Sequence, residues 1–184
     1  MSSAPIIHLN GAPGVGKLTI GRLLAAHLKA RLLDNHAIYD VALAVTDFRS
    51  AEFFETVRAV RAIAYDRVVR SPLSMPIVLT DALFEDSDWG RESWRDVLLL
   101  AERRKVPLLA VCLTCGPDEH RRRIVAEDRA AKRKAREPEL VDRYVVRPLA
   151  RLHGPHSLAL DVTDLTADAA ASHIADWTAK ASAI

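Results

Sequence analysis

Residues 10–19 read NGAPGVGKLT, between the apolar run IIHL at residues 6–9 and a segment with apolar residues at helical spacing. This stretch matches a phosphate-binding loop, G-x-x-x-x-G-K followed by Ser or Thr, except that Leu18 takes the hydroxyl position and Thr19 follows it. Phosphate binding needs successive backbone N–H groups that converge on anionic oxygens, and glycines permit that path because they carry no side chain. The N-terminus of a following helix adds partial positive charge, and Lys17 adds a point charge. The stretch therefore favours a phosphate-binding loop over a glycine-rich turn with a surface lysine.

The composition is that of one folded domain. The chain has 184 residues, of which 49% are hydrophobic and 27% charged, with a formal net charge of +2. This balance excludes a disordered chain, and the small net charge gives no global field for nucleic acid or membranes. No apolar run is long enough to span a bilayer, and the opening MSSAPIIHLN lacks the features of a secretory signal. We therefore expect a single domain over residues 1–184, in the cytoplasm, without nucleic-acid or membrane partners.

Short apolar runs alternate with longer segments of helical periodicity along the chain. The sequence predicts strands at residues 6–9, 31–33, 77–80, 108–113 and 157–162. It predicts helices at residues 19–30, 51–69, 89–104, 117–135, 138–152 and 166–180. Strands separated by helices are typical of an α/β fold, here a three-layer α/β/α arrangement with a five-stranded parallel sheet.

Ligands of such sheets bind beyond the carboxyl ends of the strands. Gly11, Asp34 and Asp81 each follow or end a predicted strand, as do the segments after residues 113 and 162. The sequence therefore predicts that these groups surround one crevice.

The two cysteines of the chain, Cys112 and Cys115, are spaced as C-x-x-C. Such a pair can be a redox motif or half of a zinc site. A structural zinc site takes four ligands, and no second close pair is present. A redox pair should open a helix, whereas these residues close an apolar run. The sequence favours two reduced thiols at a strand end.

Residues 11–19, GAPGVGKLT, resemble the loop G-x-P-G-x-G-K-G-T of adenylate kinases, with Leu18 as the departure. The chain thus resembles the P-loop small-molecule and nucleoside monophosphate kinases, which implies a P-loop fold with ATP and Mg²⁺ as cofactors. In that group the residue after the lysine needs no hydroxyl, because magnesium is held largely through water. By this resemblance Thr19 contacts phosphate and helps to hold the metal, and Asp81 orients metal-bound water. The nucleotide-binding residues that it implies are Gly11, Ala12, Pro13, Gly14, Val15, Gly16, Lys17, Leu18 and Thr19.

The second predicted strand ends in Asp34-Asn35-His36, where the similar shikimate kinases carry D-x-D. The acids of that motif serve metal-bound water and the substrate hydroxyl. By resemblance Asp34 and His36 are therefore candidate substrate-binding and catalytic residues. A histidine can also accept a hydroxyl proton near neutral pH, so the base stays open between the two. A turn without a catalytic role is the alternative.

A basic stretch spans residues 121–136, with six Arg and two Lys against two acids. Kinases of this group begin a mobile lid with a similar arginine motif, which implies a lid-like region at about residues 117–140. Arg123 fits that motif and would act on the phosphates, while the weaker candidates are Arg122, Arg129 and Lys132. The alternatives are a solvated basic helix or a nucleic-acid-binding module, although aromatic residues suited to base stacking are absent from this stretch.

Two further segments carry candidate contacts. In related kinases the helices between the second and third strands cap the acceptor, which implies a capping region at about residues 36–72. Arg58 and Arg61 lie there on one helix side and would suit an anionic acceptor, with a solvated surface as the alternative. After the last strand, LDVTDLT resembles a segment of gluconate kinases that lies beside the adenine, so Thr163 and Leu165 are candidate base contacts.

The sequence as a whole predicts an ATP- and Mg²⁺-dependent kinase that transfers the γ-phosphoryl group to a small-molecule acceptor. The acceptor stays open among sugar acids, shikimate-like molecules, nucleotides and antibiotics. A GTP-binding switch is disfavoured because no N-K-x-D or T-K-x-D segment follows a late strand. A nucleotide-binding P-loop protein without a small-molecule acceptor remains the alternative.

Overall fold

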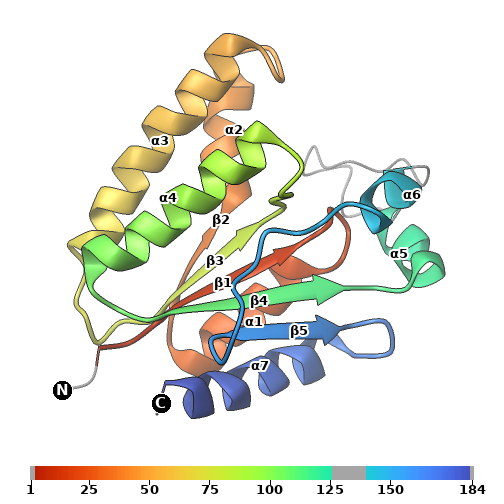
Figure 1. Ribbon diagram of the computed structural model, residues 1–184. Helices are drawn as coiled ribbons and strands as arrows, with labels where there is room; N and C mark the ends of the chain where they lie inside the picture. The colour runs from red at the N-terminus through yellow and green to blue at the C-terminus, as the bar shows by residue number, and fades with distance from the viewer. Residues whose placement is uncertain (1–2, 126–139, 183–184) are drawn as a thin grey trace.

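The computed structural model describes residues 3–125 and 140–182. Five parallel strands form one sheet in the order β2-β3-β1-β4-β5 (Figure 1). The strands are β1 (Ile6–Gly11), β2 (Arg31–Asp34), β3 (Ile77–Asp81), β4 (Leu108–Thr114) and β5 (Ser157–Asp161). The predicted five-stranded parallel sheet is confirmed.

Helices cover both faces of this sheet. They are α1 (Lys17–Leu28), α2 (Asn35–Val45), α3 (Ala51–Val69), α4 (Asp88–Arg104), α5 (Pro117–Ile124), α6 (Leu140–Val145) and α7 (Ala167–Ala181). In Figure 1, α1 and α7 lie on one face of the sheet, and α3 and α4 lie on the other. The predicted three-layer α/β/α architecture is therefore confirmed.

The sheet has a hydrophobic cluster on each face, and the side chains of β1 contribute alternately to the two clusters. Ile7 and Leu9 pack into a cluster with residues of α1 and α7, while Ile6 packs into a cluster with residues of α3 and α4. Successive side chains of a strand point to opposite faces, so a strand covered on both sides must be apolar at nearly every position. His8 is the exception in this run: it is fully buried and lies against Trp94 of α4, with ring centroids 5.2 Å apart.

Several element boundaries differ from the sequence-based prediction. Helix α2 lies largely within the helical capping region expected at about residues 36–72, but its own bounds were not predicted, because its start coincides with a turn-like Asp-Asn pair. Of the two long helices predicted at residues 117–135 and 138–152, α5 ends at Ile124 and α6 ends at Val145. After α6 the chain turns at residues 146–147, and Leu149 then forms an antiparallel bridge with Phe84, a pairing that a helical residue does not make. Residues 126–139 lie outside the described residues.

Residues at the N-termini of α7 and α1 explain where these helices begin. Thr166 caps α7, since its side chain accepts a hydrogen bond from the N–H of Ala169 at 3.1 Å. Helix α1 begins at Lys17, directly after the loop. Within the described residues, each helix is too short or too polar to cross a bilayer.

Candidate functional site

The loop between β1 and α1 turns through two glycines in the left-handed region. Gly14 has φ of 100° and Gly16 has φ of 108°, a conformation that strains other residues. Gly16 is also the N-cap of α1, so the loop passes directly into the helix N-terminus. Lys17 Nζ donates to the carbonyl oxygens of Gly11 at 2.8 Å and Ala12 at 2.9 Å. The loop therefore combines a helix N-terminus with one ammonium group, the two features that favour anion binding.

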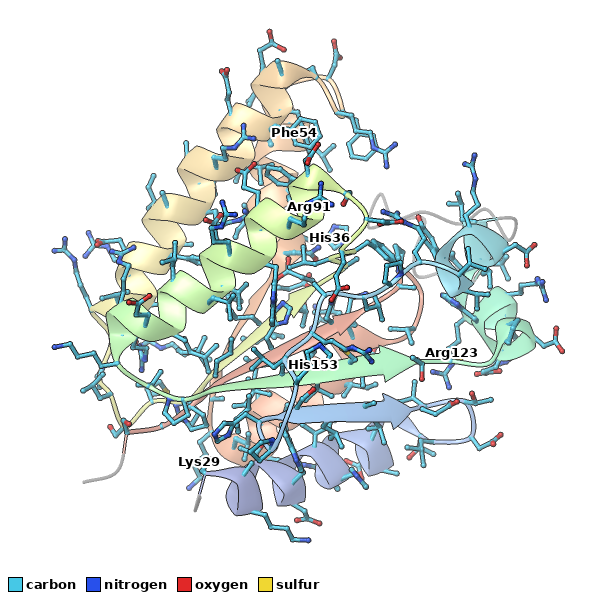
Figure 2. All side chains as sticks on the ribbon, viewed as in Figure 1. Lys29, His36, Phe54, Arg91, Arg123 and His153 are labelled. Atoms are coloured by element: carbon cyan, nitrogen blue, oxygen red, sulfur yellow. The ribbon has the colours of Figure 1, made fainter. Side chains whose placement is uncertain are left out.

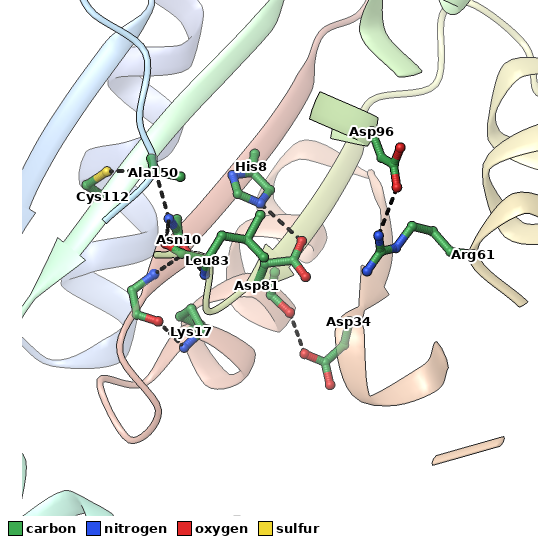
Figure 3. A network of polar contacts seen from close by, with 12 residues as sticks. His8, Asn10, Lys17, Asp34, Arg61, Asp81, Leu83, Asp96, Cys112 and Ala150 are labelled. Carbon is green, nitrogen blue, oxygen red and sulfur yellow. Dashed lines mark hydrogen bonds and ion pairs between the residues drawn. The ribbon is translucent and has the colours of Figure 1, made fainter. Parts of the chain in front are cut away.

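Asn10 holds the base of this loop in place. Its amide nitrogen donates to the carbonyls of Leu83 at 2.9 Å and Ala150 at 2.7 Å (Figure 3). Its amide oxygen accepts from the N–H groups of Leu83 at 2.8 Å and Gly11 at 3.0 Å. Asn10 thus ties the loop to the segment after β3 and to the segment before β5. Sequence analysis missed this role, because partners so distant in the chain leave no local pattern.

Two acidic side chains end neighbouring strands beside the loop. Asp34 ends β2 and accepts a hydrogen bond from Thr80 Oγ1, its register partner on β3. Asp81 ends β3, and its Oδ2 lies 3.1 Å from Nε2 of His8 (Figure 3). The sheet therefore carries Asp34 and Asp81 at the same edge as the loop. These carboxylates, with the Thr19 hydroxyl, are oxygen ligands of the kind that Mg²⁺ prefers.

A cleft of about 790 Å³ opens in front of the loop. Its wall is formed by the loop and α1, by α2 and α3, by the segment after β3, and by α5 and α6. The predicted site residues that line it are Pro13, Gly14, Gly16, Lys17, Leu18, Thr19, His36, Arg122, Arg123 and Leu165. Those that do not are Gly11, Ala12, Val15, Asp34, Arg58, Arg61, Asp81 and Thr163. Arg129 and Lys132 lie outside the described residues.

The two predicted acceptor arginines are engaged by α4. Arg58 forms a two-point ion pair with Glu92, at 2.5 and 2.9 Å, and is exposed. Arg61 is buried and donates to Asp96 at 2.9 Å. Both guanidinium groups lie over the ring of Trp89, at 5.3 Å for Arg58 and 4.8 Å for Arg61. Their contacts connect α3 to α4.

A smaller polar pocket adjoins the main cleft, with Asn35 and Tyr39 lining both. Its lining includes Arg61, Tyr39, Tyr65 and Asp81. The Tyr39 hydroxyl accepts a hydrogen bond from Trp89 Nε1 at 3.0 Å. Burial, reinforced by the negative charge of Asp81, raises the pKa of Tyr39. Tyr39 is therefore a neutral phenol at physiological pH.

Helix α5 is fastened to the loop by two side chains. Nε2 of His120 lies 2.7 Å from the carbonyl oxygen of Pro13. Arg123 donates to the carbonyls of Val15 at 3.1 Å, Val162 at 2.8 Å and Thr163 at 3.3 Å. Arg123 thus joins the loop to the segment between β5 and α7, in addition to lining the cleft. Figure 2 shows it near the end of β4, where α5 begins.

Glu119 joins the two arginines of α5 that line the cleft. It accepts two hydrogen bonds from Arg122, both at 2.6 Å, and one from Arg123 at 2.6 Å. Hydrogen bonding to Arg122 and then to Arg123 lowers the pKa of Glu119 to about 2. The carboxylate therefore stays ionised at physiological pH and holds both guanidinium groups in place.

Other cleft residues were not found from the sequence. They include the basic residues Arg22, Arg49 and Arg147 and a group of aromatic residues. Arg147 forms an ion pair with Asp86 at 2.6 Å and lies 3.9 Å from the ring centroid of Phe84. These residues come from separate parts of the chain, so no spacing rule could have joined them.

Cys112 and Cys115 are both buried and free of any disulfide. Burial raises the pKa of the Cys112 thiol to about 11 and also raises that of Cys115. Within residues 3–125 and 140–182, no group of three or more His, Cys, Asp or Glu is placed to hold a metal ion. The structure therefore agrees with two reduced thiols at the end of β4.

Known structures share this architecture. A Chloroflexus aurantiacus protein provisionally described as a kinase has a TM-score of 0.70 at 18% identity, over 98% of this chain and 99% of that chain. The Mycobacterium tuberculosis APS kinase CysC, in complex with AMPPNP and APS, has a TM-score of 0.62 at 18% identity, over 96% and 98%. Shikimate kinase from Acinetobacter baumannii, in complex with shikimate, has a TM-score of 0.56 at 17% identity, over 96% and 94%. No curated protein sequence matches the chain.

One family model matches most of the chain. The model AAA_18, described as an AAA domain, aligns with residues 7–143. That range contains the glycine loop, both strand-end acids, and helices α1 to α5. The chain therefore belongs to the AAA_18 family of AAA domains, with the fold of the P-loop small-molecule and nucleotide kinases.

Proposed function

We propose that this protein is an ATP-dependent kinase that transfers the γ-phosphoryl group to a small-molecule acceptor. The observation that carries the proposal is the position of the glycine loop, with Lys17, at one side of a single cleft of about 790 Å³. That volume lies in the upper part of the ordinary range for ligand sites, about 300–1,000 Å³. It leaves room for a second small molecule beside the phosphates of a nucleotide. As a kinase that uses ATP, the protein would act in the cytoplasm.

The loop side of the cleft supplies positive charge and hydrogen-bond donors. Lys17 and the backbone amides at the start of α1 would hold the phosphate oxygens and stabilise the charge that spreads over them during transfer. Thr19 and Asp81 would hold Mg²⁺ through water, and the bound metal would neutralise charge on the phosphates. Arg122 and Arg123 line the same cleft from α5 and add positive charge there.

The acceptor needs a group that receives its proton. His36 lines the cleft at the start of α2, whereas Asp34 accepts a hydrogen bond from Thr80 and does not line the cleft. We therefore propose His36 as the group that accepts the hydroxyl proton and Asp34 as a support for the strand end. A lower kcat in His36→Ala than in Asp34→Asn would support this assignment, and the reverse order would contradict it.

The main competing function is nucleotide hydrolysis without an acceptor. A protein of that kind needs no second binding surface, yet here residues of α2, α3 and the segment after β3 line the same cleft as the loop. This feature favours an acceptor. A nucleic-acid-binding role has less support, because Arg121, Arg122 and Arg123 are each engaged by acidic residues of α5 or α6.

The proposal is tested by measuring ADP release from ATP and Mg²⁺ with a panel of acceptors. Lys17→Ala should abolish acceptor-dependent turnover, because the loop loses its only ammonium group. Lys29→Ala, an exposed change at the other end of α1, is the matched control and should behave as wild type. Full acceptor-dependent turnover in Lys17→Ala would overturn the proposal.

A further inference from the structure

The aromatic residues of this chain are concentrated at the cleft. The sequence contains four Phe, three Tyr and three Trp. All four phenylalanines line the cleft, together with Tyr39, Tyr144 and Trp89. By contrast, the largest fully buried side chains are all Ile or Leu. The largest fully buried side chains are thus aliphatic, and most of the rings line the cleft, where Phe53 and Phe84 are themselves buried.

Five of these residues form one continuous surface, which we call the aromatic wall: Tyr39 from α2, Phe48 from the connection to α3, Phe53 and Phe54 from α3, and Trp89 from α4. The centroid of Phe53 lies 5.8 Å from that of Tyr39, 5.3 Å from that of Phe48 and 5.4 Å from that of Phe54. The centroids of Phe54 and Trp89 are 4.8 Å apart. The wall is therefore a packed unit whose orientation is fixed before any ligand arrives.

The wall is incompletely covered by the protein itself. Phe48 is 65% exposed, and Tyr39, Phe54 and Trp89 are half-buried. Phe54 and His36, both labelled in Figure 2, line the same cleft. Large aromatic side chains that remain open to a concave site are typical of ligand contacts, because a bound apolar group removes their area from water.

The polar groups near the wall are too few for a polyhydroxylated acceptor. The neutral polar residues of the cleft on this side are Asn35, His36, Ser87 and Tyr39, whose hydroxyl accepts from Trp89 and keeps its own proton to donate. An open-chain sugar acid would place several hydroxyl groups against ring faces, where each unpaired group costs free energy. A planar ring would instead stack on the wall and leave one hydroxyl or phosphate for the loop.

We infer that the acceptor carries a planar aromatic ring that stacks on the wall, with the accepting oxygen on a group attached to that ring. This inference rests on the proposed kinase function. Two sources share this chemistry, namely nucleosides or their monophosphates and aryl alcohols. Arg49 distinguishes these two classes of acceptor. It is exposed, lies 5.2 Å from the ring of Phe48, and has no ion-pair partner among the described residues. An anionic group on the acceptor would be bound there.

Two measurements on the full chain test the inference. The first is ADP release with thymidine, adenosine, their monophosphates, benzyl alcohol, D-gluconate and shikimate. A ring-bearing compound should stimulate release at least about tenfold, and gluconate and shikimate should not. The second is calorimetric binding of the same compounds, which needs no turnover. Preference for gluconate or shikimate, or no binding of any ring-bearing compound, would overturn the inference.

Variants of the wall make the test specific. Phe48→Ala and Phe54→Ala should each weaken binding of the ring-bearing compound by about tenfold, in line with loss of one stacking partner, and leave the KM for ATP unchanged. Ile63→Ala, on the outer side of α3 and 68% exposed, is the matched control and should bind as wild type. Unchanged affinity in both Phe variants would contradict the inference. Phe48 is exposed enough that its replacement should not unfold the protein.

The outcomes separate the inference from the function on which it rests. If no compound gives release that depends on Lys17, the kinase proposal fails, while ring binding by calorimetry can still succeed. If release depends on Lys17 but only with polyols, the kinase stands and the ring inference falls. A loss of monophosphate preference in Arg49→Ala identifies a nucleotide, and preference for benzyl alcohol identifies an aryl alcohol.

Discussion

Nε2 of His8 lies 3.1 Å from Oδ2 of Asp81, and the imidazole is completely buried between the sheet and α4. The two residues sit on adjacent strands, and the ring of Trp94 packs against His8 from α4. One side of the Asp81 carboxylate is thus held by the protein core. The rest of the group lines the smaller polar pocket, with the side chain 12% exposed. His8 therefore positions the carboxylate proposed to hold Mg²⁺ through water.

Replacing His8 by Phe should lower activity by about ten- to a hundredfold and raise the Mg²⁺ concentration needed for half-maximal rate, as for other residues that orient a metal-binding group. The ring volume stays similar, but Asp81 loses its partner. His8→Gln keeps a donor and should recover part of the loss. A magnesium titration of ADP release checks this prediction, and unchanged Mg²⁺ dependence in His8→Phe would contradict it.

Asn10→Leu should reduce the free energy of unfolding by about 3 kcal/mol, because buried groups of Leu83, Ala150 and Gly11 lose their partner. Nucleotide affinity should fall as well, since the base of the loop is no longer tied down. Urea denaturation and a fluorescent ATP analogue measure the two effects. A stable variant with full affinity would show that the ties are dispensable.

Arg123→Ala should raise the KM for ATP by about tenfold, because three hydrogen bonds from one charged group to the loop and to the β5–α7 segment are lost. If Arg123 instead acts on the transferred phosphate, as the sequence resemblance implies, kcat should fall with little change in KM. Steady-state kinetics distinguish the two roles. Arg121→Ala serves as the control, because Arg121 pairs with Asp118 and Asp142 away from the cleft.

The Cys112 thiol should react slowly with alkylating reagents in the folded protein and quickly in denaturant. Burial raises its pKa from the ordinary value of 9.0 to about 11, so little thiolate exists near pH 8. The pKa of this thiol is higher in the folded state than in the unfolded state. Its contribution to folding stability is therefore fully present below pH 9 and is lost as the pH rises towards 11. Mass spectrometry after timed alkylation checks the rate. Rapid native labelling at Cys112 would contradict the prediction.

Local pattern was enough for the sheet and its loop. The apolar runs of β1, β3 and β4 and the periodic segments of α1, α3 and α4 are long enough to be recognised without tertiary contacts. Prediction failed where long-range contacts override local preference. The segment after α6 leaves the helix to bridge Phe84 through Leu149, and Ala150 accepts from Asn10. The bounds of helix α2 were not predicted, because residues that favour turns stand at its start.

The sequence by itself determined the fold and the position of the glycine-rich loop, because glycine spacing, Lys17 and strand periodicity are local properties of the chain. Only the tertiary structure decided which side chains share the cleft. Arg58 and Arg61 turn towards acids of α4, His8 meets Asp81 across two strands, and rings from α2, α3 and α4 form the aromatic wall. These pairings join residues that are distant in the chain, and only the packing of helices on the sheet selects them.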